Sequence, residues 1–318
     1  MKHSTNATSY LRRNLSEDGR ILWFAFNYLF RNLFIISSID CCIVMYHTFY
    51  EPHPALQEYI SGIFVLDIDF TLPGSLSPIY TFVPSHTRFI CFYLHDQVKV
   101  RKQNGEFIAR ERAIIIGPQL TPVTLDLGKK HQTVIVVLKP CSMYRLLGVP
   151  LEEIVDRDFD ARLILGREID EVLERLMEAG TDQDKNEVVQ NYFLCKLSGL
   201  KPALPFDRAM LQQVNAMGSL SMDYLASQSC LSVRQFERKS LERIGLPPKL
   251  FARMVRFTNA YKFKEDFPHI TWNEIAYRFG YFDQMHFIRD FKYFAGFIPH
   301  LLKKEDLATS VRFQTLAN

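Results

Sequence analysis

A degenerate repeat in the last third of the chain constrains its fold more than any other feature. Residues 220–226 (LSMDYLA) correspond to residues 270–276 (ITWNEIA), and residues 231–238 (LSVRQFER) correspond to residues 282–289 (FDQMHFIR). Each copy runs on to a glycine and then a proline. Two copies of helix, tight turn and second helix are the sequence form of two helix-turn-helix modules. A duplicated groove-reading module predicts a chain that binds a nucleic-acid duplex.

Capping signals mark where the helices of each copy begin. Each candidate N-cap has a side-chain oxygen that can accept a hydrogen bond from a backbone amide: Ser221, Ser232, Thr271 and Asp283. Glu274 and Gln235 stand three residues after two of these caps and complete capping boxes. Gly280 suits a turn that needs a positive φ, whereas the first copy has Cys230 there and is one residue shorter. We therefore expect the two turns to differ slightly.

The second helix of each module presents an outer face that can reach base edges. The side chains expected to contact bases are Arg234, Glu237, Arg238, Gln284, Met285 and Arg289. Those expected to contact phosphates are Gln235, Arg256 and His286. Arginine commonly reads guanine, glutamine can read adenine, and methionine can contact a thymine methyl group. The side chains expected to turn inward are Val233, Phe236, Phe287 and Phe291.

The segment between the two copies predicts a long linking helix over residues 249–266. Its apolar side chains recur at helical spacing: Leu250, Phe251, Met254, Phe257 and Tyr261. A helix of roughly eighteen residues spans about 27 Å. Successive major grooves on one side of a duplex lie ~34 Å apart. Two modules held by this helix are therefore expected to enter successive grooves.

Residues 206–305 resemble the arabinose-regulator (AraC/XylS-type) family of bacterial transcription regulators. The segments that carry the resemblance are LSVRQFER (231–238), GLPP (245–248), RMVRF (253–257), IAYRFGYFDQMHFIRDFK (275–292) and AGFIP (295–299). The resemblance implies a seven-helix DNA-binding domain with base contacts from both recognition helices. The family usually has an aromatic residue at the position of Ser240, which the second copy keeps as Phe291. We therefore expect the first recognition helix to pack less firmly than the second.

The N-terminal half reads as strands. Short β-branched or aromatic runs occupy residues 60–66, 88–94, 113–116 and 133–138, with turn-like residues between them. The Asn104-Gly105 pair gives the clearest hairpin signal. Apolar spacing predicts a helix over residues 168–179, and we expect hinge or linker segments at residues 180–185 and 202–205. The expected fold is α+β, with a small antiparallel β-barrel or sandwich and attached helices, followed by an all-α domain with two helix-turn-helix modules.

The same half resembles, more loosely, the cupin-like N-terminal domains attached to many members of that family. The matching segments are FVP (82–84), IGPQ (116–119), VVLKP (136–140) and LLGVP (146–150). Such domains imply ligand sensing, self-association or both. The expected division is an extension over residues 1–44, a sensor domain over 45–200, a DNA-binding domain over 206–306 and a tail over 307–318. The expected partners are double-stranded DNA, a small-molecule effector, a second copy of the chain and RNA polymerase.

The charge distribution and the absence of several motifs limit which other functions the sequence allows. Residues 206–306 carry a net charge of +4 and residues 45–205 one of −4, so DNA affinity should depend on individually placed contacts. The histidines are scattered without a His-x-His pair, and no Cys-x-x-Cys pair is present. Nucleophile-elbow, phosphate-loop and dinucleotide motifs are also missing. We therefore expect a non-enzymatic, cytoplasmic protein without metal or cofactor. A β-barrel metalloenzyme with a helical tail is the alternative from another class.

Residues 21–45 form an apolar and aromatic run interrupted by Arg31 and Asp40. Its length would span a bilayer, but a charge near its middle makes insertion costly. Three interpretations stay open: a membrane anchor, which would make the chain a tethered regulator; a helix packed on the body; and an extension outside the functional fold. The last includes translation that starts at Met45.

Overall fold

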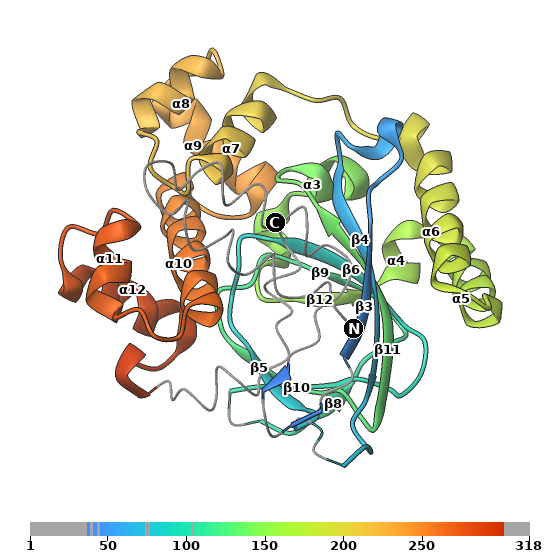
Figure 1. Ribbon diagram of the computed structural model, residues 1–318. Helices are drawn as coiled ribbons and strands as arrows, with labels where there is room; N and C mark the ends of the chain where they lie inside the picture. The colour runs from blue at the N-terminus through green and yellow to red at the C-terminus, as the bar shows by residue number, and fades with distance from the viewer. Residues whose placement is uncertain are drawn as a thin grey trace, which may run out of the picture.

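The computed structural model describes residues 37–38, 41–42, 45–73, 75, 77–103 and 105–301. The expected tail over residues 307–318 lies outside these residues. So does the expected extension over residues 1–44, apart from two short strands, β1 (Ser37–Ser38) and β2 (Cys41–Cys42). Figure 1 shows a β-rich centre with one group of helices, α4 to α6, on one side and a second group, α7 to α12, on the other.

A six-stranded antiparallel sheet forms the larger part of the N-terminal half. Its strand order is β12-β9-β6-β11-β4-β3. The strands are β3 (Met45–Tyr50), β4 (Ile60–Asp69), β6 (Arg88–Tyr93), β9 (Ala113–Ile116), β11 (Lys130–Leu138) and β12 (Asp158–Asp160). Every residue of β6 is buried, because this central strand is covered on both faces.

A four-stranded sheet of order β5-β10-β7-β8 faces the larger one. Its strands are β5 (Ile79–Phe82), β7 (Lys99–Lys102), β8 (Ile108–Ala109) and β10 (Val123–Asp126). The hairpin predicted at Asn104-Gly105 is confirmed, because β7 and β8 pair with Val100 opposite Ile108. One apolar core is shared between the two sheets, with Phe82 and Val100 on one side and Phe89 and Ile135 on the other. The predicted antiparallel barrel or sandwich is therefore confirmed.

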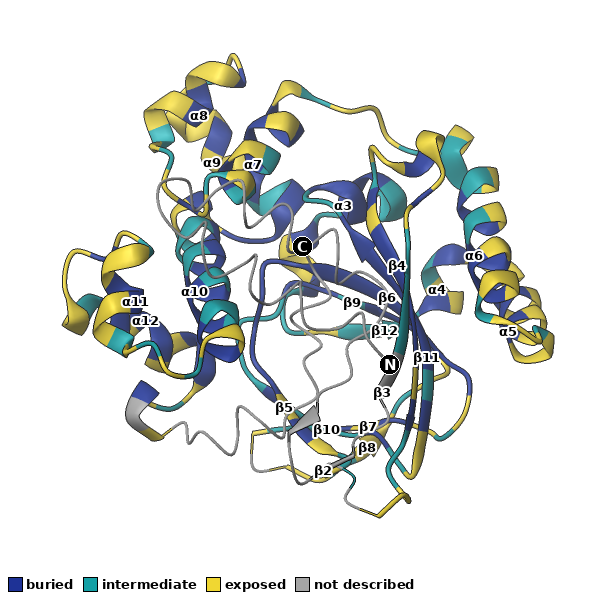
Figure 2. Cartoon of the chain, in the orientation of Figure 1, coloured by how far each residue is buried: buried dark blue, intermediate teal, exposed yellow. Residues whose placement is uncertain are grey.

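Helices cover the outer face of the larger sheet. They are α3 (Ser142–Leu147), α4 (Ala161–Leu165), α5 (Glu168–Glu178) and α6 (Asp182–Lys196), with single turns η1 (Pro54–Leu56), η2 (Leu151–Ile154) and η3 (Leu197–Gly199). The helix predicted over residues 168–179 is confirmed as α5, whose buried stripe faces the core (Figure 2). The hinge predicted over residues 180–185 is wrong. Thr181 and Asp184 form a capping box, so most of that segment is the first turn of α6.

The C-terminal half is all helical. It contains α7 (Pro205–Asn215), α8 (Met222–Gln228), α9 (Val233–Ile244), α10 (Pro248–Asp266), α11 (Trp272–Arg278), α12 (Gln284–Ala295) and the turn η4 (Pro299–Leu301). The two helix-turn-helix modules are α8 with α9 and α11 with α12, and α10 stands between them (Figure 1). Fully buried phenylalanines join both modules to α10 in one core: Phe236, Phe251, Phe257, Phe287 and Phe291. The two predicted modules and the predicted linking helix are confirmed, and the described residues form six α-helices and one 3-10 turn where the resemblance implies seven helices.

Candidate nucleic-acid interface and ligand cavity

The first module exposes the charged side chains of its second helix. Ser232 Oγ accepts a hydrogen bond from the Gln235 amide at 3.3 Å, and Gln235 Oε1 accepts one from the Ser232 amide at 2.9 Å. This capping box fixes the start of α9 and leaves only the Nε2 group of Gln235 to donate outward. The three side chains expected to contact bases are all exposed: Arg234, Glu237 and Arg238. Within the described part of the chain, no ion pair occupies them.

Two expectations about α9 need adjustment. Val233 is 39% exposed, so the prediction that it turns inward is wrong. As the first residue of the helix it stands before the buried stripe that Phe236 begins. Ser240 is fully buried, and its hydroxyl donates to the Leu246 carbonyl at 2.7 Å. The Ser240 hydroxyl thus holds the end of α9 to the following loop by a hydrogen bond. At the equivalent position of α12, Phe291 packs through its ring instead.

The two turns have the same geometry, contrary to expectation. Cys230 has φ +54° and Gly280 has φ +68°. In each copy the next amide returns to the first helix, Leu231 N to Ala226 O at 3.0 Å and Tyr281 N to Ala276 O at 3.0 Å. The additional residue of the second copy is Phe282, which follows the turn, precedes the cap of α12 and is 93% exposed. The length difference therefore alters the approach to α12 and leaves the turn itself unchanged.

The second module presents a matching face. Asp283 Oδ1 accepts the His286 amide at 2.6 Å and so begins α12. Gln284, Met285 and Arg289 are exposed. His286 is half-buried, with its ring 5.5 Å from that of Tyr281. The backbone amides of the first turn and the exposed side chains beside them all face away from the core, as a surface that meets a groove requires.

Arg256 lies on α10 between the two modules. Its Nη2 donates to the Gly218 carbonyl at 3.2 Å, and its guanidinium lies 5.4 Å from the centre of the Tyr281 ring. Gly218 belongs to the loop before α8, and Tyr281 follows the turn of the second module. One half-buried cation therefore contacts both modules, and part of its donor capacity is already used inside the protein.

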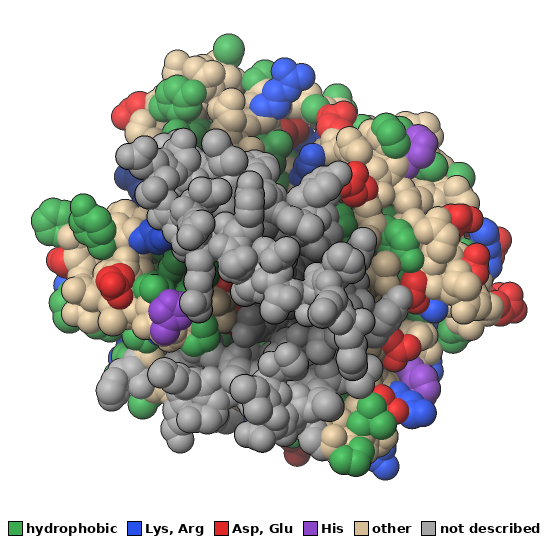
Figure 3. Space-filling model, in the orientation of Figure 1, with side chains coloured by type: hydrophobic (Ala, Val, Ile, Leu, Met, Phe, Trp, Pro, Cys, Tyr) green, Lys and Arg blue, Asp and Glu red, His purple; other side chains and the backbone are tan. Residues whose placement is uncertain are grey.

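Hydrophobic side chains also gather at the outer edge of the second module, on the face that Figure 3 shows. The exposed apolar residues there include Tyr277 in the last turn of α11, Phe282 in the following loop and Met285 in the first turn of α12. A methionine at the start of a helix that reads a groove can contact a thymine methyl group. No cluster of three or more His, Cys, Asp or Glu able to hold a metal ion occurs among the described residues. In the same part of the chain, no helix is both long enough and apolar enough to cross a bilayer.

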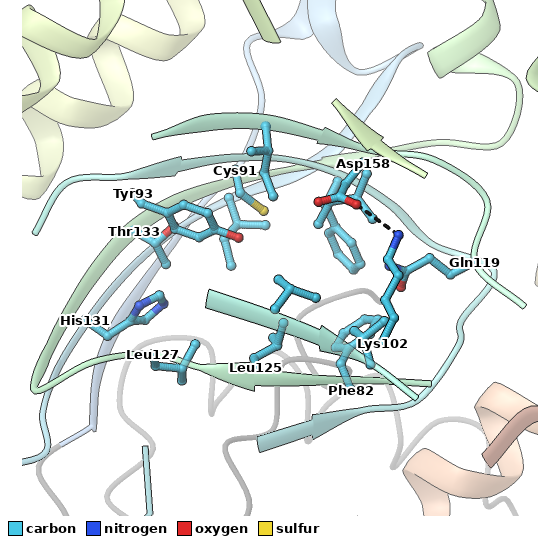
Figure 4. Close-up of a pocket in the computed structure, with 16 residues that line it drawn as sticks. Phe82, Cys91, Tyr93, Lys102, Gln119, Leu125, Leu127, His131, Thr133 and Asp158 are labelled. Carbon is cyan, nitrogen blue, oxygen red and sulfur yellow. Dashed lines mark hydrogen bonds and ion pairs between the residues drawn. The ribbon is translucent and has the colours of Figure 1, made fainter. Parts of the chain in front are cut away.

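A cavity lies between the two sheets of the N-terminal half. It has about 690 Å³ of empty volume, its open mouth included. Small-molecule sites are mostly apolar, with a few placed polar groups. Figure 4 shows polar side chains gathered at two ends: Tyr93, Thr133 and His131 at one, and Lys102, Gln119 and Asp158 at the other. Leucine, isoleucine, valine and phenylalanine side chains line most of the space between them.

The two ends of the cavity differ electrostatically. Burial lowers the pKa of His131 to about 4 and raises that of Cys91 to about 12, so both side chains are neutral near pH 7. At the other end, Lys102 Nζ lies 3.1 Å from Asp158 Oδ1, and Arg110 pairs with the same carboxylate. The cavity is thus neutral at the Tyr93 end and carries two cations around one carboxylate at the Lys102 end.

Comparisons with known proteins separate the same two halves. Residues 225–305 match a family model described as a helix-turn-helix domain, and residues 48–160 match one described as a domain of unknown function (DUF6597). No curated protein matches the chain.

Three solved structures illustrate the similarity at the level of coordinates. The apo form of a ToxT variant from Vibrio cholerae is 13% identical with a TM-score of 0.43, over 82% of this chain and 100% of that one. ToxT from Vibrio cholerae with a bound unsaturated fatty acid is 12% identical with a TM-score of 0.42, over 82% and 98%. The AraC-like transcriptional activator CuxR is 12% identical with a TM-score of 0.24, over 68% and 86%.

Proposed function

We propose that this chain, a DNA-binding transcription regulator of the AraC type, uses α9 and α12 to read two successive major grooves of one duplex. The observation that carries the proposal is a matched pair of exposed arginines, Arg238 on α9 and Arg289 on α12. They occupy the same position in the repeat, one turn into each second helix. An arginine at this point of a recognition helix can donate two parallel hydrogen bonds to a guanine.

The connection between the modules supports reading in successive grooves. The linking helix α10 has 19 residues, which corresponds to about 28 Å. Its Arg253 pairs with the buried Asp290 of α12 at 2.7 Å, and Lys264 Nζ donates to the carbonyls of Pro268 and Ile270 at 2.7 and 2.6 Å. These ties hold the second module rigidly on α10. A fixed spacer of this length is close to the ~34 Å that separates successive grooves.

Individual roles follow from position and exposure. We assign base contacts to Arg234, Glu237, Arg238, Gln284, Met285 and Arg289, and phosphate contacts to Gln235, Arg256 and His286. Phosphate contacts orient the protein without reading sequence. Arg256 is the central one in this scheme, because it lies between the modules and faces the stretch of backbone between the two grooves.

The test uses an operator selected from genomic DNA by the purified protein, a scrambled duplex of equal length and two salt concentrations. Arg238→Ala and Arg289→Ala should each lower operator affinity by about 5- to 150-fold, the range for one base contact of roughly 1–3 kcal/mol. Binding to scrambled DNA should stay within about threefold, since phosphate contacts supply non-specific affinity. The matched control is Arg208→Ala, which removes an exposed arginine of α7. Equal losses on both duplexes for Arg238→Ala would assign that residue to the backbone instead.

Arg256→Ala should behave differently. Binding to both duplexes should weaken, and the slope of log affinity against log salt should become shallower by about one. Because Arg256 also holds the Gly218 loop, the thermal stability of the variant is measured alongside. An unchanged salt slope would remove Arg256 from the DNA interface and leave it a purely internal role.

We further propose that a small, mostly apolar organic molecule binds in the cavity between the sheets and controls DNA binding. The apolar lining of the cavity supports this, together with the polar groups at its two ends. Thermal-shift screening of apolar compounds measures binding directly. Leu125→Trp, which places an indole in the cavity, should abolish any shift that the native chain shows. A shift that survives this substitution would place the ligand elsewhere.

A further inference from the structure

The loop that joins β9 to β10, residues 117–122, contacts the ends of both recognition helices. A Cβ placed on Gly245, the C-cap of α9, would lie 2.7 Å from Pro118 Cγ. One placed on Gly296, the C-cap of α12, would lie 3.2 Å from Pro122 Cγ. Between the two prolines, Leu120 packs on the core of the helical half. One face of a single short loop therefore touches both modules.

The other face of the loop belongs to the cavity. Gln119 and the first residue of β10, Val123, line it. Figure 4 shows Gln119 beside Lys102 and Asp158 at one end of the cavity. Alternate residues of an extended segment point in opposite directions. The sequence Pro118, Gln119, Leu120 thus places a cavity side chain between two side chains that contact the DNA-binding half.

Asp156 holds this loop in place. Its Oδ1 accepts the amides of Leu120 and Thr121 at 2.7 and 3.1 Å and the Thr121 hydroxyl at 3.3 Å. Its own amide donates to the Pro118 carbonyl at 2.6 Å. Asp156 has φ +55°, a conformation that few residues other than glycine, asparagine and aspartate adopt readily. This backbone conformation aims both its amide and its carboxylate at the loop.

Lys102 connects the clamp to the cavity. Its Nζ donates to the Asp156 carbonyl at 2.8 Å and to Asp158 Oδ1 at 3.1 Å, and both Lys102 and Asp158 line the cavity. A molecule that fills this end of the cavity meets Lys102 and Gln119 together. It therefore meets the clamp and the loop in a single contact.

We propose that residues 117–122, clamped by Asp156, couple occupancy of the cavity to the placement of both recognition helices. The inference rests on the proposed control of DNA binding through the cavity. A ligand that displaces Gln119 or Lys102 shifts Pro118 against α9 and Pro122 against α12, and so alters the spacing of the two modules. Because one loop carries both contacts, the two modules respond together.

Amide hydrogen exchange of the full chain without DNA tests the coupling. Asp156→Ala should speed exchange of the Leu120 and Thr121 amides about tenfold, since each loses its acceptor. The amides of Gly245 and Gly296, which close α9 and α12, should speed up at least about threefold. Asp156→Asn keeps an acceptor oxygen and suits the positive φ, so it should stay within about twofold of the native chain.

A second carboxylate provides the matched control. Asp96 Oδ2 accepts the amides of Lys129 and Lys130 at 2.7 and 3.0 Å, in a turn that makes no described contact with the helical half. Asp96→Ala should loosen those two amides only. If it changed Gly245 and Gly296 as much as Asp156→Ala does, or if Asp156→Ala loosened the loop without the two helix ends, the coupling would be refuted.

A third set of exchange measurements uses a variant in which a side chain fills the cavity. Leu125→Trp should change exchange at Gly245 and Gly296 in the native background and should lose that effect when combined with Asp156→Ala. An effect of equal size in the native and Asp156→Ala backgrounds would show that the cavity acts on the helix ends without the loop, and it would overturn the proposal. If Asp156→Ala does not fold, Lys102→Met takes its place, because it removes the Nζ hydrogen bonds and leaves the Asp156 carboxylate. The exchange measurements contain no DNA, so they decide the coupling whether or not the chain binds a duplex. Failure to bind any duplex would refute the proposed function only.

Discussion

The ion pair between Arg243 and Asp207 offers the sharpest test of how the first recognition helix is held. Arg243 Nε and Nη2 donate to the two carboxylate oxygens of Asp207 at 2.7 and 2.6 Å, which joins α9 to α7. The side chains are only 3% and 10% exposed. The Arg243 guanidinium also lies 4.6 Å from the centre of the Tyr144 ring, on α3 of the N-terminal half. One buried cation of α9 thus contacts two other helices, α7 and α3.

Removal of one partner should be costly, because it strands a buried charge. Arg243→Met keeps much of the side-chain volume and should lower the free energy of unfolding by about 3–5 kcal/mol. Asp207→Asn should cost a similar amount, with part of the loss coming from the cap at the start of α7, where Asp207 Oδ2 accepts the Leu204 amide at 3.0 Å. The double variant leaves no uncompensated charge. It should therefore be more stable than the sum of the single losses implies, by roughly 2–3 kcal/mol.

Urea unfolding followed by far-ultraviolet circular dichroism measures these differences, and Arg208→Met, an exposed arginine of α7, is the control that should change stability by less than about 0.5 kcal/mol. Strong non-additivity between the Arg243 and Asp207 substitutions is therefore expected. Additive losses in the double variant, or a loss below about 1 kcal/mol for Arg243→Met, would mean that solvent reaches the pair and that burial does not govern its strength.

Two further predictions follow from burial and backbone geometry. Gly245→Ala should destabilise the chain by several kcal/mol in urea unfolding, because φ is +83° and the added Cβ would lie 2.7 Å from Pro118 Cγ and 2.8 Å from the Leu151 carbonyl oxygen. Gly280→Ala, at φ +68° with no described atom within 4 Å of the new Cβ, should cost only about 1–2 kcal/mol, and equal losses would contradict a packed Gly245. Burial lowers the pKa of His86 to about 3 and that of His131 to about 4, so both are neutral in the fold and gain protons on unfolding below their ordinary pKa of about 6.5. Unfolding free energy measured at pH 7, 6 and 5 should therefore fall as pH falls below 6.5, by about 1.4 kcal/mol per pH unit for each histidine; a slope that His86→Gln leaves unchanged would show that His86 is not kept neutral by burial.

Local signals explain why the helical half could be predicted closely. Capping residues and the glycines at 245 and 296 fix the ends of α9 and α12 through hydrogen bonds within a few residues of each other. The same signal was missed at Thr181 and Asp184, which is why a helical turn was expected to be a hinge. Val233 shows the limit of a periodic pattern: at the first position of a helix, spacing alone does not decide whether another element covers the side chain.

Local sequence signals do not predict the cavity or the contacts of the loop over residues 117–122. Cys91 and His131 are forty residues apart and look like scattered polar positions, yet β6 and β11 pair side by side and turn both into one space. Strand order and register decide this, and they depend on contacts between distant segments. Likewise, the resemblance placed residues 116–119 in a sensor domain, but nothing local indicates that Pro118 meets Gly245.

The sequence divides the chain into two parts, but the two parts share one buried hydrophobic cluster. Val83 and Cys141, from the N-terminal half, belong to the same buried cluster as Phe236 and Phe291, and the His86 ring lies 6.4 Å from that of Phe251. A hydrophobic cluster shared across a linker couples the stabilities of the parts that build it. Any shift of the loop between β9 and β10 then changes the packing of the helical core as well as the two helix ends. If an effector binds in the cavity as proposed, it would not need a hinge between rigid bodies to act on the helical half, because the C-caps of α9 and α12 already lie against the loop that lines the cavity.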